Sequence, residues 1–354
     1  MPHLFHRARA ATRPALAAAL VLPCAWAAAA PPMYTYQVVE GTRGATTAAV
    51  ALSDTAIAGV AWAKHAKQNK PHSVVATRGD VVVFTPDGAF SQATAVNNVA
   101  DVVGGVQVGQ GQVYLRTADG TITRPLDPFG FAFSGASGIN SSRTIIGGYA
   151  VTGTVTSPFS YHDGVLTTLP TLGFESNTAA AINDAGTIVG TVQSGPDSQN
   201  YQAVTWTNGV LATLPPLHVG DSTSARGISS NGLVAGQSGT PHTTNIHAVL
   251  WSGGAPTDLG DLGGATHFSQ AAAVNASGDV VGYSIPPVQD GNDAFLYTQG
   301  RMYKLSDLVP GLPRNYTISS GLAINDAGVI LVNCRNNAEK NFSMLLTPMA
   351  PAQH

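Results

Sequence analysis

The sequence has few charged residues and almost no cysteine. Charged residues make up 10% of its 354 residues, and its two cysteines are Cys24 and Cys334. A framework of several disulfide bonds is therefore excluded, and packing must stabilise the fold. The 17 basic residues do not outnumber the 20 acidic ones. Because proteins that bind nucleic acids usually carry a strongly basic surface, we expect no nucleic-acid partner.

Motifs of common catalytic sites are also absent. The chain has no G-x-S-x-G motif, no phosphate-binding loop and no dinucleotide-binding fingerprint. After residue 30 it has three glutamates, Glu40, Glu175 and Glu339, which lie far apart, so a glycosidase-type carboxylate pair is not evident. These absences argue against an enzyme but do not exclude one, because a motif search does not detect a catalytic site assembled from separate loops.

We predict no metal site and no cofactor. Residues 290–293, Asp-Gly-Asn-Asp, resemble part of a calcium loop but lack the alternating ligands and distal glutamate of an EF-hand. We interpret them as a hairpin connection and leave calcium binding there open. Other aspartates, such as Asp184, Asp279 and Asp326, lie in turn sequences. The histidines of the chain after residue 30 show no pair at zinc-binding spacing, and they include His65, His72, His162, His218, His242, His247 and His267.

Long apolar runs are missing, but the N-terminus has the composition of a secretory signal. No segment has the roughly 18 consecutive apolar residues of a membrane-spanning helix. Three arginines precede an apolar run at residues 14–26, and alanines fill 27–30. We therefore expect cleavage near Ala30 and a secreted, periplasmic or cell-surface protein. Residues 1–30 are the predicted signal peptide, 31–350 a single domain and 351–354 a tail.

A ten-residue pattern recurs seven times in the rest of the chain. Its clearest copy is AINDAGTIVG at residues 181–190, and a shortened copy opens the series at 51–59. Six copies end on glycines that are 45, 43, 43, 46 and 46 residues apart, namely Gly59, Gly104, Gly147, Gly190, Gly236 and Gly282. We expect these glycines to permit either close packing or positive φ. A fixed period of this length is typical of stacked or radially arranged units.

Each unit has the sequence of two β-hairpins. Residues 178–182 and 187–192 have the composition of strands, and Asn-Asp-Ala-Gly between them favours a turn. Residues 202–206 and 210–214 form a second predicted hairpin. An aromatic residue precedes a turn glycine by three positions in four units, at Tyr161, Trp206, Trp251 and Tyr297. We interpret this as a packing position between units rather than a set of sugar-stacking rings.

Four strands per unit is the content of a propeller blade, because a lone four-stranded sheet must pack against neighbours to bury both faces. The last unit lacks its fourth strand, whereas residues 34–40, YTYQVVE, alternate like a strand before the first unit. The sequence therefore predicts an all-β, monomeric, seven-bladed β-propeller of four-stranded blades, with the N-terminal strand completing the last blade. An open β-solenoid is the competing architecture, but we see no capped ends.

Two units resemble a known family. In one, HAVLW at 247–251 precedes DLGDLGG at 258–264, and DAFLY at 293–297 takes the place of HAVLW in the next. With the pattern A-x-N-x-x-G-x-V-V-G, these segments resemble the extracellular HAF repeat family of bacterial proteins, over roughly residues 41–348. No copy has the full His-Ala-Phe tripeptide, and the first two units match only in the ten-residue pattern. The resemblance implies export and a repeated, propeller-like all-β fold, without catalytic residues.

One position of the repeat supplies candidate binding residues. Ser53 and Ser229 occupy this position in two units, and the other five units have Asn97, Asn140, Asn183, Asn275 and Asn325. A ring of such side chains at a channel mouth would hold a cation or a polar ligand. Asn and Ser before a glycine are also ordinary turn formers, and we favour this structural interpretation.

The function hypothesis follows from the variable segments. Connectors at 150–157, 194–200, 239–245 and 286–292 differ in length and composition between units. We expect a secreted, non-enzymatic binding protein that presents loops to an extracellular polymer, a surface or a protein partner. The alternative is an exported hydrolase or lyase with a site at the channel mouth, with or without a metal ion. A structural envelope or matrix protein is a third hypothesis.

Overall fold

The structure is a computed structural model of the chain. It describes residues 30–39, 46–62, 71–77, 80–86, 90–107, 111–151, 156–195, 200–239, 245–263, 267–286, 291–337 and 341–350. The chain divides into two compact units, Met1–Pro31 and Pro32–His354, and the described strands belong to the second. The predicted signal peptide lies outside the described residues apart from Ala30, and so does the predicted tail at 351–354.

The second unit is built from β-sheets. Its described residues contain strands and two short 3-10 helices, η3 (Asp127–Phe129) and η4 (Leu305–Leu308), but no α-helix. Five sheets have four strands each and one has eight. Four of the four-stranded sheets follow one another in the chain. The first two consist of β2 (Thr46–Leu52), β3 (Ala56–Trp62), β4 (Pro71–Thr77) and β5 (Asp80–Phe84), and of β6 (Ser91–Val96), β7 (Val102–Val106), β8 (Gln112–Arg116) and β9 (Ile122–Thr123). The next two consist of β10 (Phe133–Ile139), β11 (Ile145–Ala150), β12 (Ser157–His162) and β13 (Val165–Thr168), and of β14 (Asn177–Ile182), β15 (Ile188–Gln193), β16 (Tyr201–Thr207) and β17 (Val210–Thr213).

The eight-stranded sheet has two halves that meet at one backbone pair. Its strands are β18 (Thr223–Ile228), β19 (Val234–Gly239), β20 (Ile246–Ser252), β21 (Ala255–Asp258), β22 (Phe268–Val274), β23 (Val280–Ile285), β24 (Asp293–Thr298) and β25 (Arg301–Lys304). Strand β20 pairs with β21 antiparallel and touches β22 at the single parallel pair Ile246 and Phe268.

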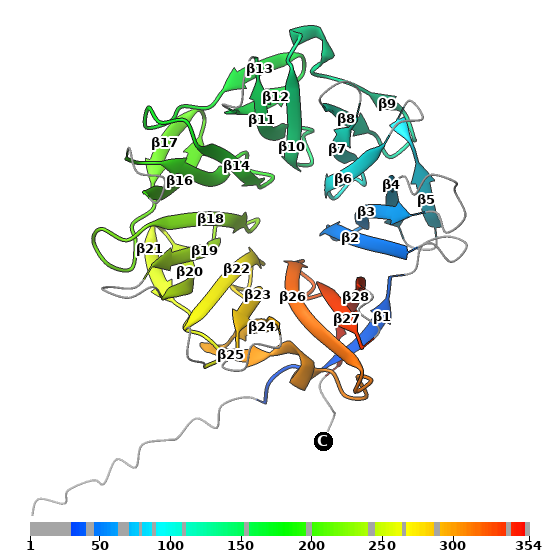
Figure 1. Cartoon of the computed structure of the whole chain (residues 1–354), viewed down its shortest axis with the longest axis vertical. Helices are drawn as coiled ribbons and strands as arrows, with labels where there is room; N and C mark the ends of the chain where they lie inside the picture. Colours follow the sequence, from blue (N-terminus) through cyan, green and yellow to red (C-terminus); the bar gives the residue numbers. More distant parts are fainter. Residues whose placement is uncertain are drawn as a thin grey trace, which may run out of the picture. The chain divides into compact units, whose positions relative to one another are not determined.

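The N-terminal strand completes the last sheet, as the sequence predicts. Strand β1 (Tyr34–Val38) pairs antiparallel with β28 (Asn341–Pro348), beyond β27 (Ile330–Asn336) and β26 (Tyr316–Ile324). Figure 1 shows the sheets around a central axis, with the first strand of each group, such as β2, β14 and β26, nearest to it. The all-β propeller of four-stranded blades is therefore confirmed.

The repeat glycines lie opposite a β-bulge of the innermost strand. In β14, Ala179 pairs with Gly190 and Ala181 with Val189, so Ala180 is the extra residue of the bulge. A Cβ atom on Gly190 would lie 2.0 Å from the carbonyl oxygen of Thr178. The φ angle of Gly190 is not positive, so close packing is the reason for glycine. The same carbonyl contact, at 1.9–2.3 Å, limits Gly59, Gly104, Gly147, Gly236 and Gly282.

The aromatic positions pack between neighbouring sheets. Trp206 and Trp251 are 1% exposed, and each indole N–H donates a hydrogen bond of 2.8 Å to a backbone carbonyl, at Pro170 and Pro215. The predicted packing role is therefore confirmed for both tryptophans. Cys334 is a buried free thiol, and burial raises its pKa to about 12. None of the helices that the structure describes is long and apolar enough to span a membrane.

Candidate functional site

The predicted ring of asparagines lies in the turns after the innermost strands. Asn183 follows β14, and its Oδ1 accepts a hydrogen bond from the backbone N–H of Thr187 at 3.0 Å. Its Nδ2 donates to the carbonyl oxygen of Ser229 in the turn after β18, at 3.1 Å. The side chain thus holds its own turn and also links that turn to the equivalent turn of the neighbouring blade.

The same link recurs in other turns. Asn97 donates to the carbonyl of Asn140 at 3.0 Å, and Asn140 donates to the carbonyl of Asn183 at 3.2 Å. Asn275 donates to the carbonyl of Asn325 at 3.3 Å. Asn97, Asn140, Asn183 and Asn275 are buried. The structure therefore brings the predicted asparagines to one end of the ring, where these four amides bond to backbone; their role in binding stays a prediction.

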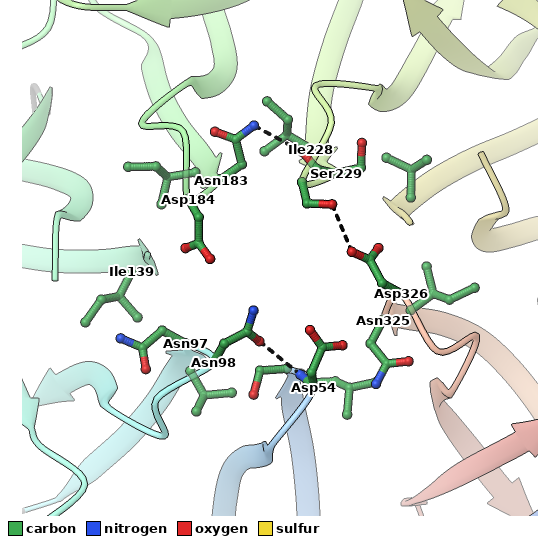
Figure 2. Close-up of a pocket in the computed structure, with 17 residues that line it drawn as sticks. Asp54, Asn97, Asn98, Ile139, Asn183, Asp184, Ile228, Ser229, Asn325 and Asp326 are labelled. Atoms are coloured by element: carbon green, nitrogen blue, oxygen red, sulfur yellow. Dashed lines mark hydrogen bonds between the residues drawn. The ribbon is translucent and has the colours of Figure 1, made fainter. Parts of the chain in front are cut away.

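An open cavity of about 190 Å³ lies among these turns. Asn97, Asn183 and Asn325 contribute to its lining. Its exposed carboxylates come from the next residue of three turns, and they are Asp54, Asp184 and Asp326. Figure 2 shows these three side chains directed toward the opening from different blades. The lining has no lysine, arginine or histidine, so the charge at the opening is negative. The rest of the wall combines polar turn residues with seven apolar side chains, which are Leu52, Val96, Ile139, Ile182, Ile228, Val274 and Ile324.

Two of the carboxylates are held by hydrogen bonds from other turns of the ring. Asp184 accepts hydrogen bonds from the backbone N–H and hydroxyl of Ser141, at 2.7 and 2.9 Å. Asp326 accepts from the backbone N–H of Ala276 and the hydroxyl of Ser230, both at 2.8 Å. These bonds fix both carboxylates at the cavity rim while leaving lone pairs for a ligand.

The third carboxylate, Asp54, is held differently. Its backbone N–H donates to Oδ1 of Asn98 at 3.0 Å, while its carboxylate accepts no hydrogen bond from the residues that the structure describes. Sequence reasoning chose the first turn position and placed Asp184 and Asp326 only in turns. The missed signal is variation: the second position is Asp in three units, Ser in two, Asn in one and Ala in one, whereas the first is Asn in five units and Ser in two.

A second polar cluster contains two histidines and two aspartates. Nδ1 of His247 lies 2.9 Å from Oδ1 of Asp258, and Nε2 of His247 lies 3.6 Å from Oδ2 of Asp261. Nδ1 of His267 lies 3.0 Å from the same Asp261 oxygen. The hydrogen bond with Asp258 raises the pKa of His247 above its usual value. Within the described ranges, no group of three or more His, Cys, Asp or Glu side chains is arranged to hold a metal ion.

The His247–Asp258 pair predicts a pH-dependent stability. Because the pKa of His247 is raised in the folded state, its contribution is fully present below about pH 6.5 and is lost as the pH rises through the folded pKa. We expect His247→Gln to destabilise the protein at pH 5.5 by up to about 1 kcal/mol, and less at pH 8.5. Urea denaturation at both pH values measures this difference. His162→Gln, at an exposed histidine of another blade, is the control, and an equal effect of His247→Gln at both pH values would contradict the prediction.

Several predicted features lie wholly or partly outside the described residues. Within the connectors, residues 152–155, 196–199, 240–244 and 287–290 lie outside the described residues. His65 and His242 lie outside them as well. Asp290 of the predicted hairpin connection lies outside as well, whereas the Asp293 carboxylate accepts a hydrogen bond of 2.8 Å from Lys304. A binding role for the connectors, and calcium at 290–293, therefore stay hypotheses.

Comparisons with known proteins identify the fold and no family. No family model matches the chain, and no curated protein matches it. The chain is similar to the β-propeller domain of the Trilobed protease from Pyrococcus furiosus, with a TM-score of 0.59 and 10% identity over 85% of this chain and 93% of that chain. This similarity, together with the sheet topology, defines a β-propeller protein.

Two longer peptidases are also similar. They are an acylaminoacyl peptidase from Pyrococcus horikoshii (TM-score 0.55, 10% identity, 87% of this chain and 53% of that chain) and a puromycin-hydrolyzing peptidase from Mycobacterium tuberculosis (TM-score 0.54, 11% identity, 88% and 56%). The chain spans about half the length of these two proteins. At such low identities the similarity concerns the propeller fold alone.

Proposed function

We propose that the propeller has seven blades and that the eight-stranded sheet represents two of them. Strands β18–β19 and β22–β23 each contain a copy of the ten-residue pattern, ending at Gly236 and Gly282. Within each half, neighbouring strands share four to six residue pairs, whereas one pair joins the halves. The repeat sequence also supports a place among the extracellular HAF repeat proteins.

On this fold the protein acts as a secreted, non-enzymatic binding protein. Its central cavity receives a positively charged group of an extracellular polymer or protein partner. The observation that carries this proposal is the set of three carboxylates, Asp54, Asp184 and Asp326, around an opening without a basic side chain. Carboxylates of this kind attract cations and form charge-assisted hydrogen bonds with ammonium groups.

The second residue of each turn supports a binding role. It differs between units and lines the cavity at Asp54, Asn98 and Asp326. Asn98 and Asp326 also accept backbone hydrogen bonds from Asp54 and Ala276, so contacts between turns hold these side chains at the cavity. Variation at exposed positions on a constant frame is typical of recognition surfaces in repeat proteins. An exported hydrolase or lyase stays a prediction, since no observation at the cavity favours it.

The proposal is tested by titrating the purified protein with a cationic probe. We expect a glucosamine hexamer to bind at low salt, and its N-acetylated form, which has no ammonium groups, to bind much more weakly. The triple variant Asp54→Asn, Asp184→Asn and Asp326→Asn is expected to lose most of this binding, measured by calorimetry. The control variant Asp127→Asn, Asp163→Asn and Asp307→Asn changes the net charge equally on other surfaces. If both triple variants bind the hexamer equally, the cavity is not the site.

A further inference from the structure

One position in the third strand of each unit faces the preceding blade. In β16 this position is Trp206, which pairs with Ile188 in β15. The indole ring packs in a buried cluster with Ile146 and Leu169 of the preceding unit, and its N–H donates to the carbonyl of Pro170 at 2.8 Å. A large ring at this position thus fills the space between two blades.

The first unit lacks such a side chain. The strand register places Ala76 of β4 opposite Ile57, as Trp206 lies opposite Ile188. The other units have larger residues at this position, and these are Arg116, Tyr161, Trp251, Tyr297 and Leu346. Ala76 therefore leaves a space that a ring fills elsewhere in the propeller.

An open groove of about 510 Å³ occupies this space. It lies where the sheet β2–β5 meets the sheet that contains β1 and β28. The two sheets are in contact, since the backbone N–H of Ala49 donates to the Ser343 hydroxyl at 3.0 Å. Apolar side chains along the groove include Val39, Ile57 and Leu345. Its volume is within the range of roughly 300–1,000 Å³ that is usual for ligand pockets.

The apolar surface continues from the groove along the outer strand of the first sheet. Val81 lines the groove, at the position that Leu211 has beside Trp206. Val81 and Val83 lie on the same face of β5 and are 41% and 38% exposed, whereas Val82, which is 40% exposed, lies on the opposite face. Strand β5 is the last strand of its sheet, so its outer edge has no strand partner among the described residues (Figure 1). Such an edge pairs readily with an extended polypeptide.

We infer that this groove binds an aromatic side chain of a partner polypeptide that extends along β5. The internal comparison indicates an aromatic ring, because Trp206 and Trp251 fill the equivalent space in other blades. The exposed valines and the free edge of β5 favour a polypeptide over a small aromatic molecule, which would use the groove alone. The groove and the cation-binding cavity share Leu52, Ser53, Asp54 and Asn325, but Ala76 and Val81 line the groove alone. The aromatic preference is tested at these two residues, so either proposal can fail without the other.

The inference is tested with two fluorescently labelled peptides that differ in one residue. They are fluorescein-Thr-Val-Trp-Val-Thr-amide and the same peptide with alanine in place of tryptophan. Fluorescence anisotropy with the full chain is expected to show at least about tenfold tighter binding of the tryptophan peptide. Ala76→Trp should fill the groove and remove this preference, while Ala212→Trp, at an exposed position of β17, should keep it.

A second variant tests the inference even if Ala76→Trp does not fold. Val81→Asp changes an exposed side chain at the groove and should weaken the tryptophan peptide by about tenfold or more. Equal binding of the two peptides, no binding of either, or wild-type binding by Val81→Asp would overturn the inference. Binding of N-acetyl-tryptophanamide as tight as that of the peptide would also overturn it, because the ring alone would then account for recognition.

Discussion

Gly104→Val is expected to prevent stable folding, whereas Gly105→Val in the same strand is expected to be tolerated. A Cβ atom on Gly104 would lie 2.1 Å from the carbonyl oxygen of Gln92 and 2.7 Å from the hydroxyl of Tyr114. Neither neighbour can move freely, because the carbonyl belongs to the innermost strand and Tyr114 is fully buried. We expect a loss of at least about 3 kcal/mol, at the upper end of the range for overpacking.

The neighbouring glycine is a matched control for this substitution. A Cβ atom on Gly105 would meet no atom within 4 Å, and its φ is not positive. Valine favours strands, so Gly105→Val should change stability little or raise it. Thermal unfolding of the two variants measures the difference, and Gly190→Val should behave like Gly104→Val. Similar melting temperatures for Gly104→Val and Gly105→Val would show that close packing at the bulge is not the reason for the repeat glycine.

Removal of residues 31–38 is expected to destabilise the whole propeller. Strand β1 is the fourth strand of the last sheet, and Tyr34 is 4% exposed in a cluster with Met344 and Leu346. Deletion exposes this cluster and the edge of β28, with an expected loss above the roughly 3–5 kcal/mol of one large aromatic side chain. Differential scanning calorimetry and gel filtration should show a lower melting temperature and self-association.

A peptide with the sequence of residues 31–39 provides the complementary experiment. Added to the truncated protein, it should restore part of the lost melting temperature, since β1 joins β28 through backbone pairing. Gln37→Ala in the intact chain changes an exposed side chain of β1 and should have an effect within about 0.5 kcal/mol. Unchanged melting of the truncated protein would mean that β1 does not stabilise the ring.

The sequence predicts the parts of the fold that depend on local chemistry. The period of the glycines and the turn chemistry around Asn183 predict the hairpins of each unit, and the alternation at Tyr34 predicts the closing strand. The contacts between units depend on how neighbouring sheets are placed. The bond from the Asn183 amide to Ser229 joins residues 46 positions apart and has no local signature.

The candidate sites also depend on contacts between units that the sequence does not reveal. Asp54 and Asp326 come from opposite ends of the described repeats, and only the ring arrangement places both at one cavity. The groove at Ala76 cannot be predicted without the strand register, because the register shows that the equivalent residues of other blades are larger than alanine. Sequence reasoning selected Asn183 and its equivalents because identity between repeats is easy to detect, whereas the carboxylates differ between repeats.

The pairing of β1 with β28 also determines when the ring can close. Thr35 and Thr347 lie side by side although 312 residues separate them in the chain. During synthesis, therefore, β1 has no pairing partner until β28 has emerged from the ribosome. A chain that ends before β28 therefore leaves the backbone of β1 unpaired, and unpaired strand edges of this kind make incompletely folded chains prone to aggregate.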